Sequence, residues 1–360
     1  MKGIKRIHTW LAATLGLALV VTVGIGIFSN AQVSAAPQKE LFEIKTWTRK
    51  DCSVTPWYVT DKLGFFAEEG IKLKLTGETQ APLQIPSILK GNNDVGTFHP
   101  NQAAVAKAGG AKITGVVQGG IEPTDPKIPE KFRHMWWYVN PTKSPNVKSF
   151  ADLKNLPGKI KIATITRNIC ADFETNLLAD KYGIPRDKFE WVAMPDIQAI
   201  QALKQGLIQV SIPHPPFYKG MADAGMKKIA DTFETGLGAS AGVTFYFFRD
   251  EFIKQHPDKV AAFSRAVIKG QRWANANPEK SAKMTEEAIG VPVTGNHYYS
   301  TAIQVDEKLI APWLKDLEDN KVIPKGKVTT SNLITHDIEK INLKVEAERK
   351  KAKGSLKKQS

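Results

Sequence analysis

The sequence predicts an α/β fold with largely parallel sheets, built from two similar halves. Predicted strands and helices alternate along most of the 360 residues, which is the pattern of strands connected by helices. At roughly 150 residues per domain, this length suits two compact units that can each bury a core. With 42% hydrophobic and 24% charged residues, the composition excludes disordered, collagen-like and polytopic membrane proteins.

The first 35 residues have the pattern of a secretory signal peptide. Three basic residues precede an apolar run from Leu11 to Phe28, and small residues ending in Ala35 and Ala36 provide a cleavage site. We expect cleavage after Ala35, with an uncleaved membrane anchor as the alternative, since 18 apolar residues nearly span a bilayer. No cysteine directly follows the run, so no lipid anchor is expected. Export without such an anchor indicates the periplasm.

The chain carries a formal net charge of +14, and much of this charge lies in a basic C-terminal tail, residues 341–360. A run of this kind is usually a solvated, frayed helix end. Basic surfaces also favour nucleic acids or anionic membranes, but no nucleic-acid motif accompanies this one, and an exported protein does not meet DNA. We therefore expect no nucleic-acid partner, and either an anionic ligand or simply good solubility.

The first half of the mature chain opens with a strand at Phe42–Ile44. A helix follows from Thr55 to Leu63, with Pro56 at its first turn and Gly64 after its last residue. Residues 71–75 alternate between apolar and polar side chains, as in a half-buried strand. A second helix, a third strand and a His-Pro pair complete this half.

The second half repeats that order of elements. It is preceded by a capping-box pattern at Ser149 and Asp152. Its elements are, in order, a strand at 160–165, a helix with an apolar stripe at Ile169, Phe173 and Leu177 that ends at Gly183, a strand at 189–192, a helix ending at Gly206, a strand and a His-Pro pair. A later helical stripe spans residues 260–268.

A short motif supports the repeat. The loop after the first strand of each half reads T-R-x-x-C, at residues 48–52 and 166–170. The histidine of each His-Pro pair, His99 or His214, follows its cysteine by 47 or 44 residues. Three matched letters are weak evidence alone, but their agreement with the order of elements favours an internal structural repeat.

The chain also resembles a known family. The phrase at residues 57–71, WYVTDKLGFFAEEGI, is similar to the opening of periplasmic substrate-binding proteins for nitrate, aliphatic sulfonates and taurine. That family also includes binders of thiamine pyrimidine precursors. Further matching phrases keep the family's order and extend the resemblance over about residues 43–290; they lie at 89–96, 150–159, 201–206, 256–260 and 273–279.

The resemblance implies the type II fold of periplasmic binding proteins, in which two α/β lobes on a two-segment hinge close on a ligand in a central cleft. It places the crossings near residues 135–139 and 242–248. The implied role is that of a monomeric receptor for an ABC-type importer, with a membrane permease and its ATPase as partners. The expected parts are a signal peptide at 1–35, lobe 1 at 40–138 plus 243–340, lobe 2 at 139–242, and the basic tail at 341–360.

The loops after the strands are expected to form the ligand site, because α/β sheets bind ligands beyond the carboxyl ends of their strands. Helix N-termini in these loops supply free N–H groups and partial positive charge, which suits an oxyanion. Ordinary helix capping explains the same residue types equally well. The candidate ligand contacts are Thr48, Arg49, Cys52, Ser53, Thr55, Thr97, His99, Asn101, Thr166, Arg167, Cys170, His214 and Phe217.

Both cysteines of the chain fall in these paired loops, together with two histidines. Sulfonate or nitrate recognition needs none of them, whereas Cys52, His99, Cys170 and His214 form a familiar ligand set for Zn²⁺ and softer cations. A soft metal, metalloid or organometal is therefore the alternative ligand, and no other cofactor is expected. The plainer explanations are a disulfide, packed or anion-binding histidines, and cysteines that act as small apolar residues.

An enzyme is the hypothesis from a different class. A Cys–His pair can form a nucleophile, and distant relatives of this fold synthesise a thiamine precursor. However, no third group evidently orients either cysteine, and the sequence has no glycine-rich phosphate loop. We therefore expect a receptor without turnover, which closes on a small anion of the sulfonate, nitrate or taurine type.

Overall fold

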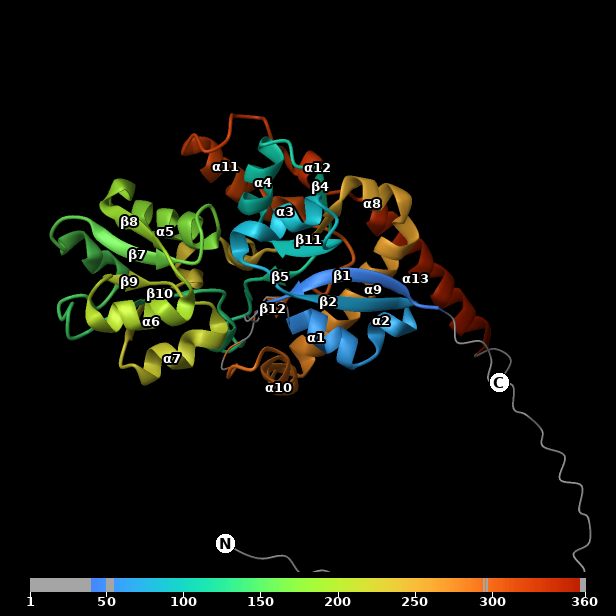
Figure 1. Cartoon of the computed structure of the whole chain (residues 1–360), viewed down its shortest axis with the longest axis horizontal. Coiled ribbons are helices and arrows are strands. Elements are labelled where there is room, and N and C mark those ends of the chain that lie inside the picture. Colours follow the sequence, from blue (N-terminus) through green and yellow to red (C-terminus); the bar gives the residue numbers. More distant parts are fainter. Residues whose placement is uncertain (1–39, 50–54, 294, 296, 357–360) are drawn as a thin grey trace, which may run out of the picture. The chain divides into compact units, whose positions relative to one another are not determined.

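The computed structural model describes residues 40–49, 55–293, 295 and 297–356 (Figure 1). The predicted signal peptide lies outside the described residues, as do the candidate contacts Cys52 and Ser53. Residues 40–360 group into one compact unit by their contacts. Within the described part of the chain, no helix is long and apolar enough to cross a membrane.

The first half builds the predicted order of strand, helix and strand. β1 (Phe42–Thr48) pairs in parallel with β2 (Ile71–Glu78), and the chain between them forms α1 (Thr55–Lys62) and α2 (Phe65–Glu68). Gly64 separates the two helices with a φ of 73°, a left-handed conformation that glycine adopts without strain. The predicted helix boundary at this glycine is thereby confirmed.

β3 (Val95–Phe98) follows α3 (Gln84–Leu89) and lies beside β1. The Asp94 N–H donates to the carbonyl of Lys45 at 2.8 Å, and the hydroxyl of Thr46 donates to the carbonyl of Val95 at 3.0 Å. β1 therefore lies between β2 and β3. This is the order in which α/β repeats commonly place a first strand between the two that follow.

The chain then builds a small antiparallel sheet. α4 (Pro100–Ala108) leads into β4 (Ile113–Gln118), and β11 (Phe245–Arg249) lies between β3 and β4, antiparallel to both. β5 (Gly120–Ile121) pairs with β12 (Tyr298–Tyr299). A strand from late in the chain thus completes the sheet of the first half.

A five-stranded sheet forms in the middle of the chain, in the order β10-β6-β9-β7-β8. Its strands are β6 (Trp136–Val139), β7 (Ile160–Thr164), β8 (Phe189–Ala193), β9 (Val210–Ser211) and β10 (Lys227–Asp231). The pairs β7–β8 and β7–β9 are parallel, whereas β6 runs antiparallel to β9 and β10. The expectation of largely parallel sheets is therefore wrong in part. The two strands that join the sheet regions, β6 and β11, are antiparallel to the strands with which they pair.

The internal repeat is visible in these sheets. α5 (Cys170–Lys181) connects β7 to β8, and α6 (Asp196–Gln205) connects β8 to β9, before the chain enters α7 (Tyr218–Asp223). The order β8-β7-β9 matches β2-β1-β3 of the first half. Both ends of the capping box are formed at Ser149 and Asp152, where a short 3₁₀ helix begins.

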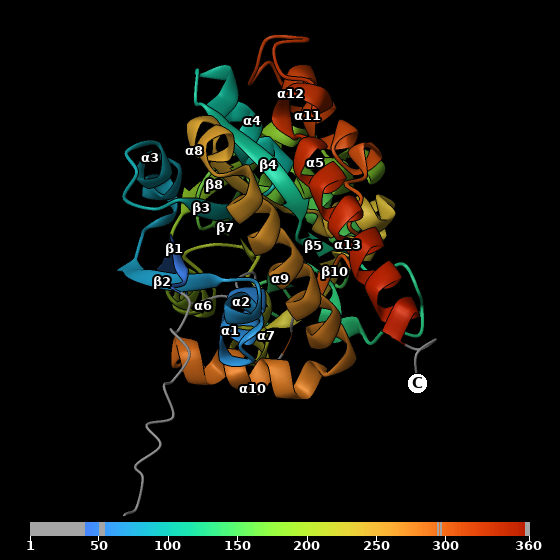
Figure 2. The same cartoon turned by 90° about the vertical axis from the view of Figure 1, so that its right-hand side faces the viewer.

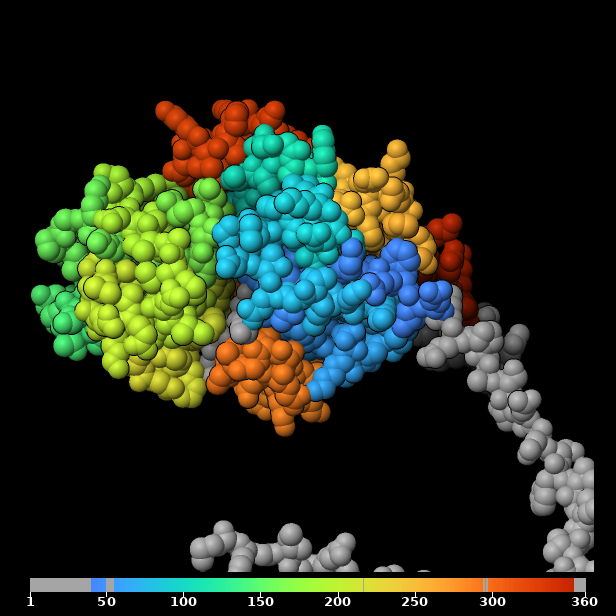
Figure 3. Space-filling view, viewed as in Figure 1, coloured from blue at the N-terminus to red at the C-terminus, as the bar shows by residue number. Residues whose placement is uncertain are grey.

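The predicted crossings lie close to the strands that join the sheets. All of β6 pairs within the five-stranded sheet, so by strand pairing the first crossing comes before Trp136, and a lobe boundary at residue 138 would fall inside β6. β11 starts at Phe245, just after the predicted return boundary at 242. In Figure 3 the green and yellow segments gather at the left of the view, beside the blue and cyan segments. The division into two lobes stays a prediction.

Helices from the last third of the chain cover the first half. In Figure 2, α9 runs beside α1 and α13. A Cβ added to Gly270 of α9 would lie only 1.9 Å from the hydroxyl oxygen of Thr60 in α1. Glycine therefore permits this close helix crossing. These helices are α8 (Asp250–Gln255), α9 (Pro257–Ala276), α10 (Pro278–Ile289), α11 (Ala311–Asp319), α12 (Thr330–Leu333) and α13 (Asp337–Leu356).

The half-buried carboxylate of Glu69 holds α13 against the body. Arg265 of α9 donates to it at 2.7 Å, and Arg349 of α13 also donates at 2.7 Å. Burial acts to raise the pKa of Glu69, but the hydrogen bonds from Arg349 and Arg265 outweigh burial and lower it from 4.5. Much of the predicted basic tail is thus a docked helix.

We expect Glu69→Gln to lower the free energy of unfolding by about 2 kcal/mol at neutral pH, because two charge-assisted hydrogen bonds are weakened. The native pKa lies below that of the unfolded chain. The carboxylate therefore stabilises the fold above about pH 4.5, and this contribution is lost as the pH falls through the lowered native pKa. Urea unfolding of both proteins across this range measures the difference.

Glu346→Gln is the matched control on α13, since its carboxylate meets Lys350 at 3.6 Å in an exposed pair. Exposed pairs contribute little, so this variant should stay within about 0.5 kcal/mol of the parent. If Glu69→Gln still lowers the free energy of unfolding by the same amount in acid, the charge of Glu69 is not the cause of the loss.

Candidate ligand-binding site

A pocket of about 450 Å³, which includes space open to solvent, lies where strands of both halves end. Arg49 follows β1, His99 follows β3, Thr166 follows β7 and His214 follows β9, and all four line this pocket. The carboxyl ends of strands are where α/β sheets bind ligands, because the connecting loops converge there. The remaining lining residues are Ala81, Gln84, Thr97, Phe98, Gln102, Ile165, Ile169, Cys170, Thr244 and His297.

Two helices begin at the pocket. His99 is the N-cap residue of α4, and Cys170 is the first residue of α5 after its N-cap, Ile169. The first N–H groups of a helix have no intrahelical acceptor, and the helix dipole adds partial positive charge at the same end. The pocket thus receives positive potential from one helix of each half.

The polar lining of the pocket favours a negative ligand. Arg49 is the only described lining residue that is charged at all ordinary pH values, and no aspartate or glutamate lines the pocket. The Thr97 hydroxyl is buried without a hydrogen-bond partner among the described residues. A ligand oxygen in the pocket would give such a hydroxyl an acceptor.

Hydrogen bonds orient two of the lining histidines. The Nδ1–H of His99 donates to the carbonyl of Val243 at 2.7 Å, and the Nδ1–H of His214 donates to the Asp196 carboxylate at 2.7 Å. In the neutral rings, the lone pair then lies on Nε2. This arrangement is the one that fixes histidine tautomers at ligand and metal sites.

A layer of buried titratable groups lies beneath the pocket. The ring of His134 packs edge-on to His99 and His297 with centroids 4.8 and 4.7 Å away, and its Nδ1 lies 3.1 Å from the Nδ1 of His297. Burial and the neighbouring imidazoles hold the pKa of His134 well below its usual range. This ring is therefore a neutral imidazole at neutral pH.

Cys170 and Glu174 lie one turn apart on α5 in the same layer. Burial, and next the charge of Glu174, raise the pKa of the Cys170 thiol well above its usual value. Burial likewise raises the pKa of Glu174, whose two carboxyl oxygens have no hydrogen-bond partner among the described residues. Burial therefore favours the neutral form of both groups.

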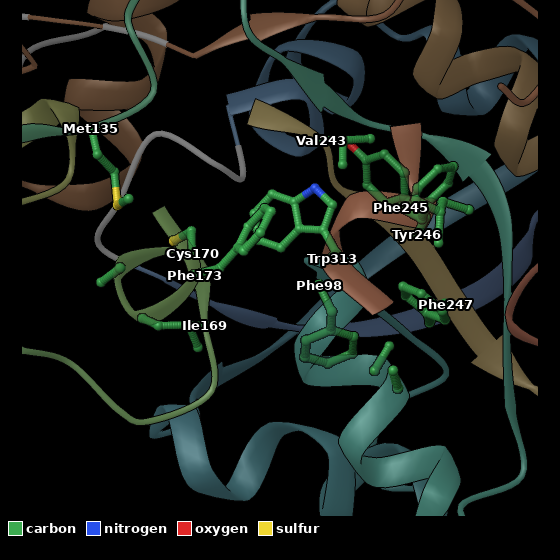
Figure 4. Close-up of a cluster of buried hydrophobic side chains, with 14 of the residues drawn as sticks. Phe98, Met135, Ile169, Cys170, Phe173, Val243, Phe245, Tyr246, Phe247 and Trp313 are labelled. Carbon is green, nitrogen blue, oxygen red and sulfur yellow. The ribbon is translucent and has the colours of Figure 1, made fainter. Parts of the chain in front are cut away.

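An indole supports the site from outside. Trp313 of α11 stacks on His99 with centroids 5.1 Å apart and also contacts Phe173 of α5 at 4.5 Å. Figure 4 shows Cys170 and Phe173 to the left of this indole and Phe98 below it. These ring contacts help to fix the position of His99.

The structure brings together six of the candidate contacts from the sequence. Five further described candidates do not line the pocket. Of these, Thr48 ends β1, and Phe217 ends a short 3₁₀ helix. Arg167 pairs with Asp172 and lies over the ring of Trp191. Thr55 accepts a hydrogen bond from Thr285, and Asn101 bonds the next backbone N–H. Those that do line it are Arg49, Thr97, His99, Thr166, Cys170 and His214.

Some site residues were not predicted from the sequence. Gln84, Gln102, Thr244 and His297 line the pocket, and His134 lies beneath it. None belongs to the repeated T-R-x-x-C motif or to a His-Pro pair. The position of His134, directly before a predicted crossing, was the one available signal. The ligand roles of all these residues stay predictions.

Comparison with known proteins identifies the fold. A family model described as "NMT1/THI5 like" matches residues 51–281. No curated protein matches the sequence. Among solved structures, the periplasmic nitrate-binding protein NrtA from Synechocystis PCC 6803 has a TM-score of 0.69 at 13% identity, over 85% of this chain and 89% of that one.

Two further structures extend this likeness. The periplasmic aliphatic sulphonate binding protein SsuA from Escherichia coli has a TM-score of 0.63 at 16% identity, over 82% of this chain and 92% of that one. The desulfurization enzyme DSZB has a TM-score of 0.59 at 10% identity, over 85% of this chain and 99% of that one. The predicted α/β fold of periplasmic binding proteins is thereby confirmed.

Proposed function

The chain belongs to the NMT1/THI5-like family, and from that premise we propose that it is the substrate-binding receptor of an ABC-type importer. The fold that it shares with nitrate- and sulphonate-binding proteins supports this role. The observation that carries the proposal is the pocket itself, which strand ends and helix N-termini from both halves of the chain form together.

The ligand that fits this pocket is a small anion of the sulfonate, nitrate or taurine type. Arg49 supplies the fixed charge, the N-termini of α4 and α5 supply N–H groups, and the Thr97 hydroxyl supplies a further donor. No acidic side chain among the described lining residues opposes an anion. Charge-assisted hydrogen bonds of this kind are the strong ones in a partly buried pocket.

Binding is proposed to work by closure of two lobes, residues 40–138 plus 243–340 and residues 139–242. An anion held by Arg49 from one lobe would recruit Thr166 and the N-terminus of α5 from the other. Closure around a ligand is a common device of hinged binding folds. The closed, monomeric form would then be presented to a permease and its ATPase from the periplasm.

We propose capture without turnover, even though the fold also occurs in the desulfurization enzyme DSZB. A cysteine nucleophile must be a thiolate, and the raised pKa of Cys170 keeps the thiol protonated. Multiple turnovers of any tightly bound compound by the pure protein would contradict this part of the proposal.

Isothermal titration with taurine, methanesulfonate and nitrate tests the proposal. We expect at least one of these anions to bind, and Arg49→Gln to weaken its affinity at least tenfold, because the fixed charge of the pocket is lost. Arg272→Gln is the control, since this exposed arginine of α9 donates to the Thr301 carbonyl and does not line the pocket.

Native mass spectrometry of the protein from its own cells complements the titration. A retained small anion would support the proposal. Absence of any retained solute, together with equal affinities of the parent and Arg49→Gln for every anion, would refute it.

A further inference from the structure

A cluster beneath the pocket has the chemistry of a metal site. Among the described residues, His99, His134 and Cys170 form a group whose candidate ligand atoms all lie within 4.8 Å of one another. Tetrahedral Zn²⁺ with one sulfur and two nitrogen ligands spaces those atoms about 3.5 Å apart, from bond lengths near 2.3 and 2.0 Å. The three side chains therefore need to approach by only about 1 Å to hold a cation.

These three residues come from three separate elements. His99 caps α4, His134 comes just before β6, and Cys170 begins α5. We propose that His99, His134 and Cys170 form a binding site for a borderline or soft divalent cation. The proposal stands beside the importer role and does not depend on it.

The hydrogen bonds around the imidazoles suit this use. His99 donates its Nδ1–H to the Val243 carbonyl, which places the lone pair of the neutral ring on Nε2. When His134 donates its Nδ1–H to His297, its own Nε2 lone pair is presented in the same way. Second partners that fix the tautomer in this manner are a regular feature of metal-binding histidines.

Two buried polar groups lack a partner in the structure described. The Nε2 of His134 has none, and neither do the two carboxyl oxygens of Glu174 one turn from Cys170. Buried polar atoms without partners are rare and require a physical reason. A cation at the cluster would give the His134 nitrogen its bond.

The ligand set selects the class of ion. One thiolate and two imidazoles suit Zn²⁺, Cd²⁺ and other borderline or soft ions, whereas Mg²⁺ and Ca²⁺ prefer oxygen ligands. Trp313 and Phe173 flank the cluster with apolar surface. Because His99 and Cys170 also line the pocket, three protein ligands leave a fourth position open toward a solute there.

This set differs from the one expected from the sequence. His214 bonds Asp196 and is not in the group, and His134 takes a place that the repeat did not indicate. Cys52, the only other cysteine in the sequence, lies outside the described residues. The two cysteines must therefore be separated by experiment.

Cd²⁺ is the probe, because a Cd–thiolate bond produces an ultraviolet charge-transfer band that reports the sulfur directly. The full chain, stripped of metal with a chelator and kept reduced with a phosphine, is titrated with Cd²⁺. We expect one equivalent to bind with the band, Cys170→Ser to abolish the band, and His134→Gln to weaken the affinity at least tenfold. Cys52→Ser and His336→Gln are the matched controls; His336 pairs with Glu307 and Glu339.

A band that persists in Cys170→Ser overturns the proposal. X-ray absorption of the Zn²⁺-loaded parent keeps the test decisive if a variant fails to fold: one sulfur and two nitrogen ligands support the site, and a shell without sulfur overturns it. Anion binding through Arg49 does not enter either measurement. Failure of the cation site would therefore leave the importer proposal standing, and failure of the latter would leave the cation site standing.

Discussion

Gly96→Ala is expected to lower the free energy of unfolding by about 3 kcal/mol or more, the upper range for overpacking of a core. A Cβ on Gly96 of β3 would lie 2.1 Å from Cη2 of Trp47, 2.8 Å from Cζ of Phe98 and 2.9 Å from Cδ1 of Ile88. Each of these distances is far shorter than a carbon–carbon contact of about 3.5–4.0 Å. Urea unfolding followed by far-ultraviolet circular dichroism measures the loss.

Trp47 cannot move aside to accept the added methyl group. Its side chain is fully buried, and its ring packs against Trp57 at 5.9 Å and Phe98 at 5.8 Å. Trp47→Phe removes the part of the indole that collides with the new Cβ. The double variant should therefore lose less stability than the sum of the two single variants, a coupling that a double-mutant cycle measures.

Gly220→Ala is the control for this comparison. Gly220 lies in α7, and an added Cβ would meet only Cδ1 of Ile200 at 3.1 Å, the flexible end of a side chain. Alanine also favours the helix by about 1 kcal/mol relative to glycine. This variant should stay within about 1 kcal/mol of the parent, and an equal loss in both variants would contradict the steric explanation for Gly96.

Local patterns in the sequence predict much of the fold because they are local in origin. Alternation identified β2, the proline and glycine around residues 56–64 bounded α1, and the apolar stripe identified α5. The repeat then predicted which strand ends meet. Arg49, His99, Cys170 and His214 do converge at one pocket because each follows a strand of the repeated unit.

The two arginines of the repeated motif show where this reasoning ends. Arg49 lines the pocket, whereas Arg167 pairs with Asp172 and lies 5.0 Å from the ring of Trp191. The first half has Val54 at the position equivalent to Asp172, and a valine offers no carboxylate. The motif alone could not predict the pair between Arg167 and Asp172, since Asp172 lies outside its five letters.

His134 and His297 could not be placed from the sequence for a related reason. Neither belongs to the repeat, and 163 positions separate the two rings, whose Nδ1 atoms lie 3.1 Å apart. Only the return of the chain through β11 and the late helices brings His297 to the site. Contacts of this kind depend on tertiary packing and carry no local signal.

Trp313 is such a contact, and it links three parts of the chain. The indole is fully buried, stacks on His99 at 5.1 Å with an interplanar angle of 14°, and packs on Phe173 at 4.5 Å. Figure 4 shows Trp313 beside Phe173. Its N–H donates to the carbonyl of Ser240 at 3.0 Å. One side chain thus joins α11 to the start of α4, to α5 and to the turn before β11.

We expect Trp313→Ala to lower the free energy of unfolding by about 3–5 kcal/mol, because a large buried ring leaves a cavity at this junction. Trp191→Ala is the control; that indole lies on β8, only half-buried under Arg167, and its loss should cost about 1 kcal/mol. Urea unfolding of both variants measures the difference. Equal losses would show that Trp313 is not a junction residue.

Trp313→Phe separates the support of the fold from the support of the site. Phenylalanine keeps an aromatic face for His99 but cannot donate to Ser240, whose own hydroxyl still donates to the Leu309 carbonyl at 2.7 Å. We expect a loss of about 1–2 kcal/mol from the missing hydrogen bond and the smaller ring. Since the stacking on His99 persists, Cd²⁺ affinity should change less than threefold. A tenfold loss in this stable variant would instead show that the full indole positions His99.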